Sequence, residues 1–262
     1  MKYLELGFDA GVATVTLNRP DVRNAFNEEL IAELSATFVG LGDREEVRCV
    51  VLAGNGPSFC AGADLNWMKR VADFDRDQNL EDAEALARML RILYTCPKPT
   101  IARVHGDVYA GGTGLVAACD IAVSVDTAHY CLSEVRLGLI PATISPYVIR
   151  AMGERAAHRY FLTAERFDAA EALRIGFVHE VVKAEALDAK VLELATAMVA
   201  NGPEAMKACK QLVQEVGGRK ITAALISRTV QGIADIRVSP EGREGVQSFL
   251  QKRKPSWLLP PG

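Results

Sequence analysis

Residues 100–125 decide the fold class, and they read TIARVHGDVYAGGTGLVAACDIAVSV. We predict a strand at 100–104, because a short apolar run there follows two prolines and is rich in β-branched residues. The glycines at 111–114 open an apolar stretch that we predict to be a short buried helix, and 120–125 predicts a second buried strand. A strand, a helix and a strand in this order favour an α/β core with a parallel sheet.

The same alternation extends toward the N-terminus. Alternating β-branched residues predict a strand at 12–17, and an apolar run predicts another at 48–53. Between them, Asn27 is a candidate N-cap with acidic residues in the first helical turn after it. A further helix is predicted at 80–93. The apolar stripe of the first helix consists of Leu30, Leu34, Phe38 and Leu41.

Beyond Ile144 the pattern changes to helices alone. Ser145 is predicted as an N-cap, Asp168 begins a segment like a capping box, and Gly176 is a natural helix-ending residue. The fold class predicted is therefore α/β with a helical C-terminal region. We assign residues 1–200 to the core that carries the active site and residues 201–262 to a helical region that drives oligomerisation.

Composition narrows the class of protein. The chain has 262 residues, 49% of them hydrophobic and 24% charged, which suits a globular protein with a sizeable core. The net charge is -3 and the one dense basic run is 252–254, so no nucleic-acid footprint is predicted. No segment is long and apolar enough for a membrane span, and residues 1–5 show no secretory signal. We expect a cytoplasmic protein without nucleic-acid or membrane partners.

Cysteine and histidine usage indicates no metal site. The six cysteines form no Cys-x-x-Cys pair, and Cys119 and Cys131 lie inside apolar runs, so buried reduced thiols are expected. The four histidines lie far apart and lack the spacing of metal ligands. They are His105, His129, His158 and His179.

Two glycine-rich segments are the candidates for chemistry. Residues 59–65 read FCAGADL and residues 110–114 read AGGTG, and each follows a predicted buried strand. Glycine and alanine let a ligand approach backbone N–H groups, and a helix that begins at Gly111 directs its positive end toward a developing negative charge. Two such N–H groups facing each other would form an oxyanion hole. The alternative is that both segments are tight turns that need glycine for packing.

Taken with other motifs, these segments resemble the enoyl-CoA hydratase/isomerase (crotonase) family over nearly the whole chain. The resemblance implies a spiral of β-β-α units, assembly as trimers that often pair into hexamers, and acyl-CoA thioester substrates. It implies no metal or redox cofactor, because coenzyme A is part of the substrate. The other motifs that carry the resemblance are 17–20, 23–27, 119–120, 133–141, 162–164 and 249–255.

The resemblance also implies site residues. The N–H groups of Ala63 and Gly111 would bind the thioester oxygen, and Glu134 would move protons. The family pattern suggests that Phe249 and Lys252 come from a neighbouring subunit, where with Arg23 they contact the nucleotide end of coenzyme A. The substrate and coenzyme A contacts implied are Arg23, Ala61, Ala63, Asp64, Leu65, Gly111, Gly112, Gly114, Phe249 and Lys252.

The chain departs from the common hydratase pattern at Gly114, where such enzymes carry a first glutamate. Their second glutamate corresponds to Glu134, whose apolar neighbours predict a raised pKa if it is buried. The alternative reading places Glu134 on the surface of a helix or turn. One carboxylate permits either hydration, in which it both activates water and delivers a proton, or double-bond isomerisation.

Local motifs rank these options. Residues 64–68, 131–136 and 141–146 are similar to the bacterial methylglutaconyl-CoA hydratases, which work in leucine and acyclic terpene breakdown. Hydration of 3-methylglutaconyl-CoA or a related branched carboxy-enoyl-CoA is therefore expected, with isomerisation second. The alternatives of another class are a non-catalytic scaffold and an RNA-binding protein. The candidate partners for the second carboxylate of the substrate are Lys69, Arg70 and Arg136.

Overall fold

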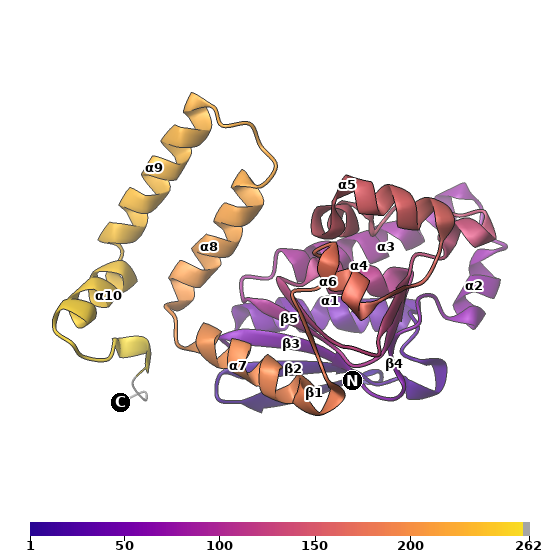
Figure 1. Ribbon diagram of the computed structural model, residues 1–262, viewed down its shortest axis with the longest axis horizontal. Helices are drawn as coiled ribbons and strands as arrows, with labels where there is room; N and C mark the ends of the chain where they lie inside the picture. The colour runs from indigo at the N-terminus through magenta and orange to yellow at the C-terminus, as the bar shows by residue number, and fades with distance from the viewer. Residues whose placement is uncertain (259–262) are drawn as a thin grey trace.

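The computed structural model describes residues 1–258. Two β-sheets with flanking helices make up the body, and helices α8 to α10 stand away from it (Figure 1). The larger sheet has the order β1-β2-β3-β5-β7-β10, and the smaller has the order β4-β6-β8-β9. No helix in the described part of the chain has the length and hydropathy needed to cross a membrane.

The strands of the larger sheet are β1 (Leu4–Asp9), β2 (Val12–Leu17), β3 (Cys49–Gly54), β5 (Thr100–Val104), β7 (Ile121–Val125) and β10 (Glu180–Val182). Those of the smaller sheet are β4 (Ser58–Cys60), β6 (Asp107–Tyr109), β8 (His129–Cys131) and β9 (Phe167–Asp168). The α-helices are α1 (Glu28–Asp43), α2 (Leu65–Val71), α3 (Arg76–Tyr94), α4 (Gly111–Ala118), α5 (Ser145–Thr163), α6 (Ala169–Arg174), α7 (Leu187–Val199), α8 (Pro203–Val216), α9 (Ala223–Val238) and α10 (Pro240–Leu250). Short 3₁₀ turns are η1 (Pro20–Val22), η2 (Glu134–Leu137), η3 (Ala184–Ala186) and η4 (Ser256–Leu258).

A repeated path links the two sheets. The chain places β3, β5 and β7 side by side in the larger sheet, and after each of them it adds β4, β6 or β8 to the smaller sheet. Both sets of strands are parallel, and each pair is followed by helical structure. This repeat is the β-β-α spiral that the family resemblance implies. The fold class, α/β with a helical C-terminal region, is confirmed.

Local signals in the sequence placed most elements of the larger sheet. The strands at 12–17 and 100–104 and the helix beginning at Gly111 are confirmed at the predicted bounds. The Asn27 side chain accepts the Leu30 N–H at 2.9 Å, which confirms the N-cap. Ser145 differs from its prediction, because it is the first residue of α5 and its hydroxyl donates to the Ala142 carbonyl oxygen. Ile144 holds the N-cap position instead.

The smaller sheet was not predicted, since its strands are only two or three residues long and show no periodicity. Helix α3 begins at Arg76 rather than at Leu80, because Asp75 and Gln78 form a capping box that holds an extra turn. The left-handed helix-ending position of Gly176 is confirmed, with φ of 77°.

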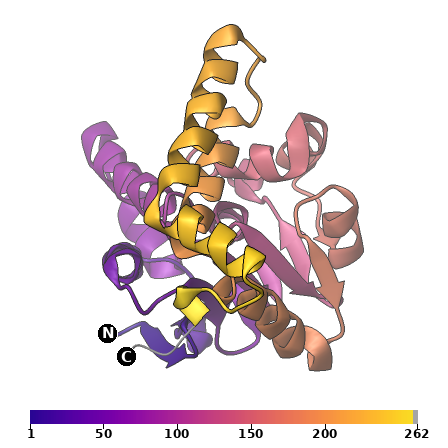
Figure 2. The same ribbon diagram turned by 90° about the vertical axis from the view of Figure 1, so that its left-hand side faces the viewer.

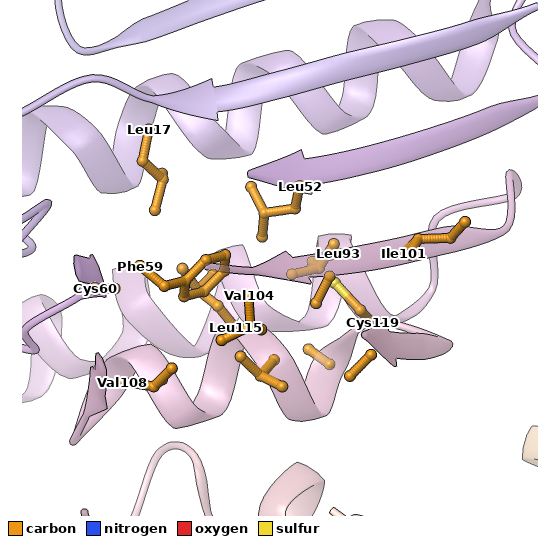
Figure 3. Close-up of a cluster of buried hydrophobic side chains, with 14 of the residues drawn as sticks. Leu17, Leu52, Phe59, Cys60, Leu93, Ile101, Val104, Val108, Leu115 and Cys119 are labelled. Carbon is orange, nitrogen blue, oxygen red and sulfur yellow. The ribbon is translucent and has the colours of Figure 1, made fainter. Parts of the chain in front are cut away.

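The main core lies between the two sheets and the helices α3 and α4. Figure 3 shows Leu17 and Leu52 of the larger sheet directed toward Phe59 and Leu115. A fully buried side chain of this kind contributes roughly 1.5–3 kcal/mol, so this layer fixes how the smaller sheet sits on the larger one. Cys119 and Cys131 are buried free thiols, as predicted.

Helices α8 to α10 contact the body mainly through polar anchors. Lys210 of α8 pairs with Asp120 at 2.7 Å, and the Gln214 side chain donates to the Tyr94 carbonyl oxygen at 2.8 Å. Neither α8 nor α9 contains a buried residue, and Figure 2 shows both rising clear of the sheets. These helices are therefore held in place without covering their own apolar side chains.

Candidate active site

Three predicted site residues follow the ends of three neighbouring strands. Ala63 follows β4, Gly111 follows β6, and Glu134 follows β8. These strands are parallel, and β6 lies between the other two. Because the carboxyl ends of neighbouring parallel strands share one edge of a sheet, the fold brings together residues from three separate segments.

The backbone around Ala63 frees one N–H group. Phe26 and Ala63 form a parallel bridge, in which the Phe26 N–H donates to the Gly62 carbonyl oxygen at 2.7 Å and the Asp64 N–H donates to the Phe26 carbonyl oxygen at 2.8 Å. In such a bridge the N–H and C=O of the middle residue face away from the partner strand. The Ala63 N–H has no acceptor among residues 1–258.

The second free N–H group belongs to the first turn of α4. Ala110, the N-cap, has φ of 45° and ψ of -119°, a conformation that alanine rarely adopts. Its N–H donates to the Cys131 carbonyl oxygen at 2.9 Å, and its own carbonyl accepts the Thr113 N–H. This turn leaves the Gly111 N–H without an acceptor in the described chain, at the positive end of the helix.

Packing also demands glycine in this turn. A Cβ at Gly111 would lie 2.9 Å from Cε2 of the Phe26 ring, and one at Gly112 would lie 2.7 Å from the Cys60 carbonyl oxygen. The packing explanation for these glycines is therefore correct. It is compatible with the donor explanation, because the same close contact sets where the Gly111 N–H lies.

Glu134 begins the turn η2 and is half-buried. Its Oε2 atom is buried and has no hydrogen-bond partner among the described residues. Burial raises the pKa of Glu134, and the hydrogen bond from its own backbone N–H only partly offsets this. The residue does lie in a helical turn, but its carboxylate is not a solvated surface group. A carboxylate held in this state is suited to accepting and releasing protons.

Gly114 lies beneath Ile144. A Cβ at Gly114 would lie 2.4 Å from Cγ2 of Ile144 and 3.5 Å from Cδ2 of Leu90. An apolar side chain therefore occupies the place into which a side chain at position 114 would project. Sequence reasoning did not single out Ile144, because it lies in an irregular segment without apolar periodicity.

The Asp64 side chain serves the fold. Its carboxylate pairs with Arg19 at 2.8 Å and accepts the Asn66 N–H at the start of α2. Burial alone would raise the pKa of Asp64, but these hydrogen bonds outweigh it and lower the pKa. The Asp64 side chain is therefore not free to contact a substrate, although its backbone is. Of the neighbouring residues predicted to contact the substrate, Ala61 and Leu65, Leu65 is exposed.

The predicted coenzyme A residues do not meet within one chain. Arg23 is exposed next to the Ala63 segment. Phe249 and Lys252 are exposed at the end of α10, which packs on α8 and α9 and lies at the opposite end of the molecule from α2 (Figure 1). This separation agrees with a contribution from a neighbouring subunit, which stays a prediction.

Two of the three candidate cations already have partners. Arg70 pairs with Glu28, and Arg136 donates to the Ala164 carbonyl oxygen at 2.6 Å. Lys69, on the exposed side of α2, has no ion pair in the described part of the chain. Among these three, Lys69 can most readily bind a carboxylate of a substrate.

Comparison with known proteins agrees with this arrangement. The family model described as enoyl-CoA hydratase/isomerase matches residues 7–259. A putative enoyl-CoA hydratase of Thermus thermophilus is 34% identical, and the alignment covers 93% of this chain and 96% of that protein. The crystal structure of an enoyl-CoA hydratase from Shewanella pealeana superposes with a TM-score of 0.95 at 45% identity, covering 97% and 96% of the two chains. The chain therefore belongs to the enoyl-CoA hydratase/isomerase (crotonase) family and is an enoyl-CoA hydratase-like enzyme.

Proposed function

We propose that the enzyme adds water to a 2-enoyl-CoA thioester with Glu134 as the only side chain that transfers protons. The observation that carries this proposal is the buried Oε2 of Glu134, which has no partner among residues 1–258. Glu134 follows β8, which lies next to the strand before Gly111, and that strand lies next to the one before Ala63. A base and two free donors then converge on one edge of the smaller sheet.

Each group has a chemical role in this proposal. The thioester oxygen accepts hydrogen bonds from the N–H groups of Ala63 and Gly111. The Glu134 carboxylate takes a proton from water, and the oxygen of that water bonds to the β-carbon. Charge moves to the thioester oxygen as an enolate, and Glu134 returns the proton to the α-carbon. A preorganised donor of this kind contributes about a hundredfold or more in rate.

Three other titratable groups are poor substitutes for Glu134. Burial raises the pKa of the Tyr109 phenol, so this group holds its proton at neutral pH. His105 is bound to the Gly56 carbonyl oxygen, and His179 accepts the Ala122 N–H. These contacts give both histidines structural roles.

The substrate we propose is 3-methylglutaconyl-CoA or a related branched carboxy-enoyl-CoA. Similarity of three local motifs to methylglutaconyl-CoA hydratases supports this choice. Lys69 would then pair with the second carboxylate of the substrate, as an exposed cation on the helix that follows Ala63. Lys69→Ala should raise KM for the carboxylated substrate and leave KM for crotonyl-CoA, which lacks that carboxylate, unchanged.

Isomerisation is the second candidate. The contact between Gly114 and Ile144 favours it, because a single carboxylate can remove a proton from one carbon and return it to another. Such a reaction needs no room for a water molecule.

A panel of acyl-CoA thioesters separates these functions. Incubation followed by mass spectrometry gives a mass gain of one water for hydration. A change in absorbance or chromatographic position without a mass change indicates isomerisation. Absence of turnover on every thioester would refute both and favour a scaffold, and a salt-dependent RNA titration would then test nucleic-acid binding.

We also propose that the chain assembles as a trimer or a hexamer. Three exposed apolar residues of α9 recur at the spacing of one helix face, which a second copy of the chain would cover. They are Ile226, Val230 and Ile233. In such an assembly, Phe249 and Lys252 would reach the coenzyme A of a neighbouring subunit. A monomer by light scattering at micromolar concentration would contradict this.

A further inference from the structure

We infer that Phe26 is a positioning residue that sets the spacing of the two oxyanion donors, and that Arg19 locks it in place. The inference rests on the proposed oxyanion hole. It concerns residues that touch neither the thioester nor Glu134 in that proposal. Phe26 is fully buried between the segment of Ala63 and the first turn of α4.

Phe26 contacts both donors, each with a different part of the residue. Its backbone makes the two hydrogen bonds that bracket Ala63, at 2.7 and 2.8 Å. Its ring lies so close to Gly111 that a single added carbon there would sit 2.9 Å from Cε2. The separation of the two N–H groups is therefore spanned by one amino acid, whose ring is rigid and has few rotamers.

Arg19 links the two segments that form this bridge. Its guanidinium donates to the carbonyl oxygen of Ala25, which precedes Phe26, and to the carboxylate of Asp64, which follows Ala63. The Arg19 and Asp64 side chains are 12% and 6% exposed, so water competes little for this pair. One planar cation thus fixes both strands of the bridge between Phe26 and Ala63.

Small errors in this spacing should be costly. An oxyanion hole acts only when both donors lie within hydrogen-bond distance of the same oxygen, and a displacement of about 1 Å can cost roughly a hundredfold in rate. A leucine at position 26 keeps an apolar side chain but leaves a gap where the ring meets Gly111. The first turn of α4 can then shift toward that gap.

The variants are Phe26→Leu and Arg19→Lys, each with a matched control. Phe38→Leu truncates another buried phenylalanine, on α1, that does not contact Ala63 or Gly111. Arg103→Lys alters another arginine that pairs with an aspartate, Asp188, on the outer side of the larger sheet near α7. Arg19→Lys keeps the charge but loses the fork that reaches two acceptors, and it tests the proposal if Phe26→Leu does not fold.

The readout is the carbonyl stretch of a bound saturated thioester, butyryl-CoA labelled with ¹³C at its carbonyl, in difference infrared spectra. The intact enzyme should lower this frequency relative to free butyryl-CoA, because two N–H groups polarise the carbonyl. Phe26→Leu and Arg19→Lys should lose at least half of that downshift. In both, kcat should fall by about tenfold to a hundredfold, with KM changed by less than about threefold. The two controls should keep the full downshift.

The outcomes distinguish the two proposals. If the intact enzyme shows no downshift on binding butyryl-CoA, the oxyanion hole itself is wrong, and this inference falls with it. If the intact enzyme shows the downshift and both variants keep it, the hole stands and the positioning role is refuted. An equal loss in Phe38→Leu or Arg103→Lys would also refute it, because the effect would then follow from general destabilisation.

Discussion

The edge of the smaller sheet and the C-terminal helices differ in which kind of group is left without a partner. At the sheet edge, several polar groups lack hydrogen-bond partners within the described chain: two backbone N–H groups and the Oε2 atom of Glu134. Apolar residues such as Ile144 pack close by. In α8, polar side chains anchor the helix to the body, and in both α8 and α9 apolar side chains stay exposed. Lys210 pairs with Asp120, yet Val213 and Val230 are exposed.

This difference shows which parts of the site one chain can build alone. The free donors and the carboxylate are held by contacts within residues 19–144, so the proposed chemical centre is complete in a single chain. We expect the exposed apolar side chains of α8 to α10 to be covered by a second copy of the chain, because water-exposed apolar stripes of this extent are unfavourable. We therefore expect changes at the sheet edge to affect kcat and changes in the C-terminal helices to affect assembly and KM.

Glu134→Gln should produce the largest effect. The amide preserves size and ligand binding but cannot accept a proton, so kcat should fall by about a hundredfold or more, the usual range for general acid–base catalysis. The acidic limb of the pH–rate profile should disappear with it. Steady-state kinetics on the best thioester measure both, with the exposed Glu154→Gln as control. Near-normal turnover of the Gln variant would assign proton transfer to another group.

Val230→Asp should disrupt the other region. Val230 is 59% exposed in the single chain and lies between Ile226 and Ile233 on one face of α9. In a subunit interface the aspartate would bury an unpaired charge, which costs several kcal/mol. Light scattering should show smaller particles, while circular dichroism stays unchanged. Gln231→Asp, at an exposed position of α9 on the side of the helix away from the apolar stripe, is the control. An assembly of unchanged mass would exclude this face from the interface.

The sequence predicted the larger sheet well and the site only in part. β-Branched residues predict strands such as β2 and β5, and glycines predict the turn at Gly111. The positions of Ala63, Gly111 and Glu134 came from family resemblance, because no local pattern shows that three short strands lie side by side. Phe26, Arg19 and Ile144 were missed as supporting residues. Their roles depend on contacts across long sequence separations, such as Arg19 with Asp64, which periodicity does not encode.

Gly114→Ala tests whether the sheet edge depends on tight apolar packing. The new methyl group would clash with Ile144, and overpacking of this kind costs about 1–3 kcal/mol in the free energy of unfolding. In a chain that carries Ile144→Ala there is room for the new methyl group. The double variant Gly114→Ala/Ile144→Ala should therefore be at least as stable as Ile144→Ala alone. Urea titrations of the three variants measure this. Gly40→Ala, at an open position in α1, is the control and should not lower the free energy of unfolding, because no neighbouring atom lies within 4 Å of the added Cβ. A harmless Gly114→Ala would show that Ile144 moves freely.

Lys252→Ala should give a smaller effect, on binding alone. Loss of one charge-assisted contact to a phosphate weakens binding by roughly tenfold, so KM should rise by about that factor while kcat stays nearly constant. The same variant should bind a dephosphorylated pantetheine thioester as well as the unaltered enzyme does. Lys254→Ala, two residues along the chain, is the control. A fall in kcat at fixed KM would remove Lys252 from the nucleotide site.

The smallest effect concerns the pH dependence of stability. Burial raises the pKa of Glu134 above its ordinary value of 4.5, so the folded protein keeps this proton to higher pH than the unfolded chain does. Between these two pKa values the folded state binds more protons, and the contribution of Glu134 to the free energy of unfolding therefore falls as pH rises. Glu134→Gln lacks this titration. Its stability relative to the unaltered enzyme should be constant below pH 4.5, should rise through the window just above it, and should then level off. Urea unfolding at a series of pH values measures the difference. A difference that stays flat across the window would mean that the Glu134 carboxylate is solvated in the folded protein. The sheet edge would then not differ from the C-terminal helices in the way described, because Glu134 is the main polar group that the fold is expected to shield from water.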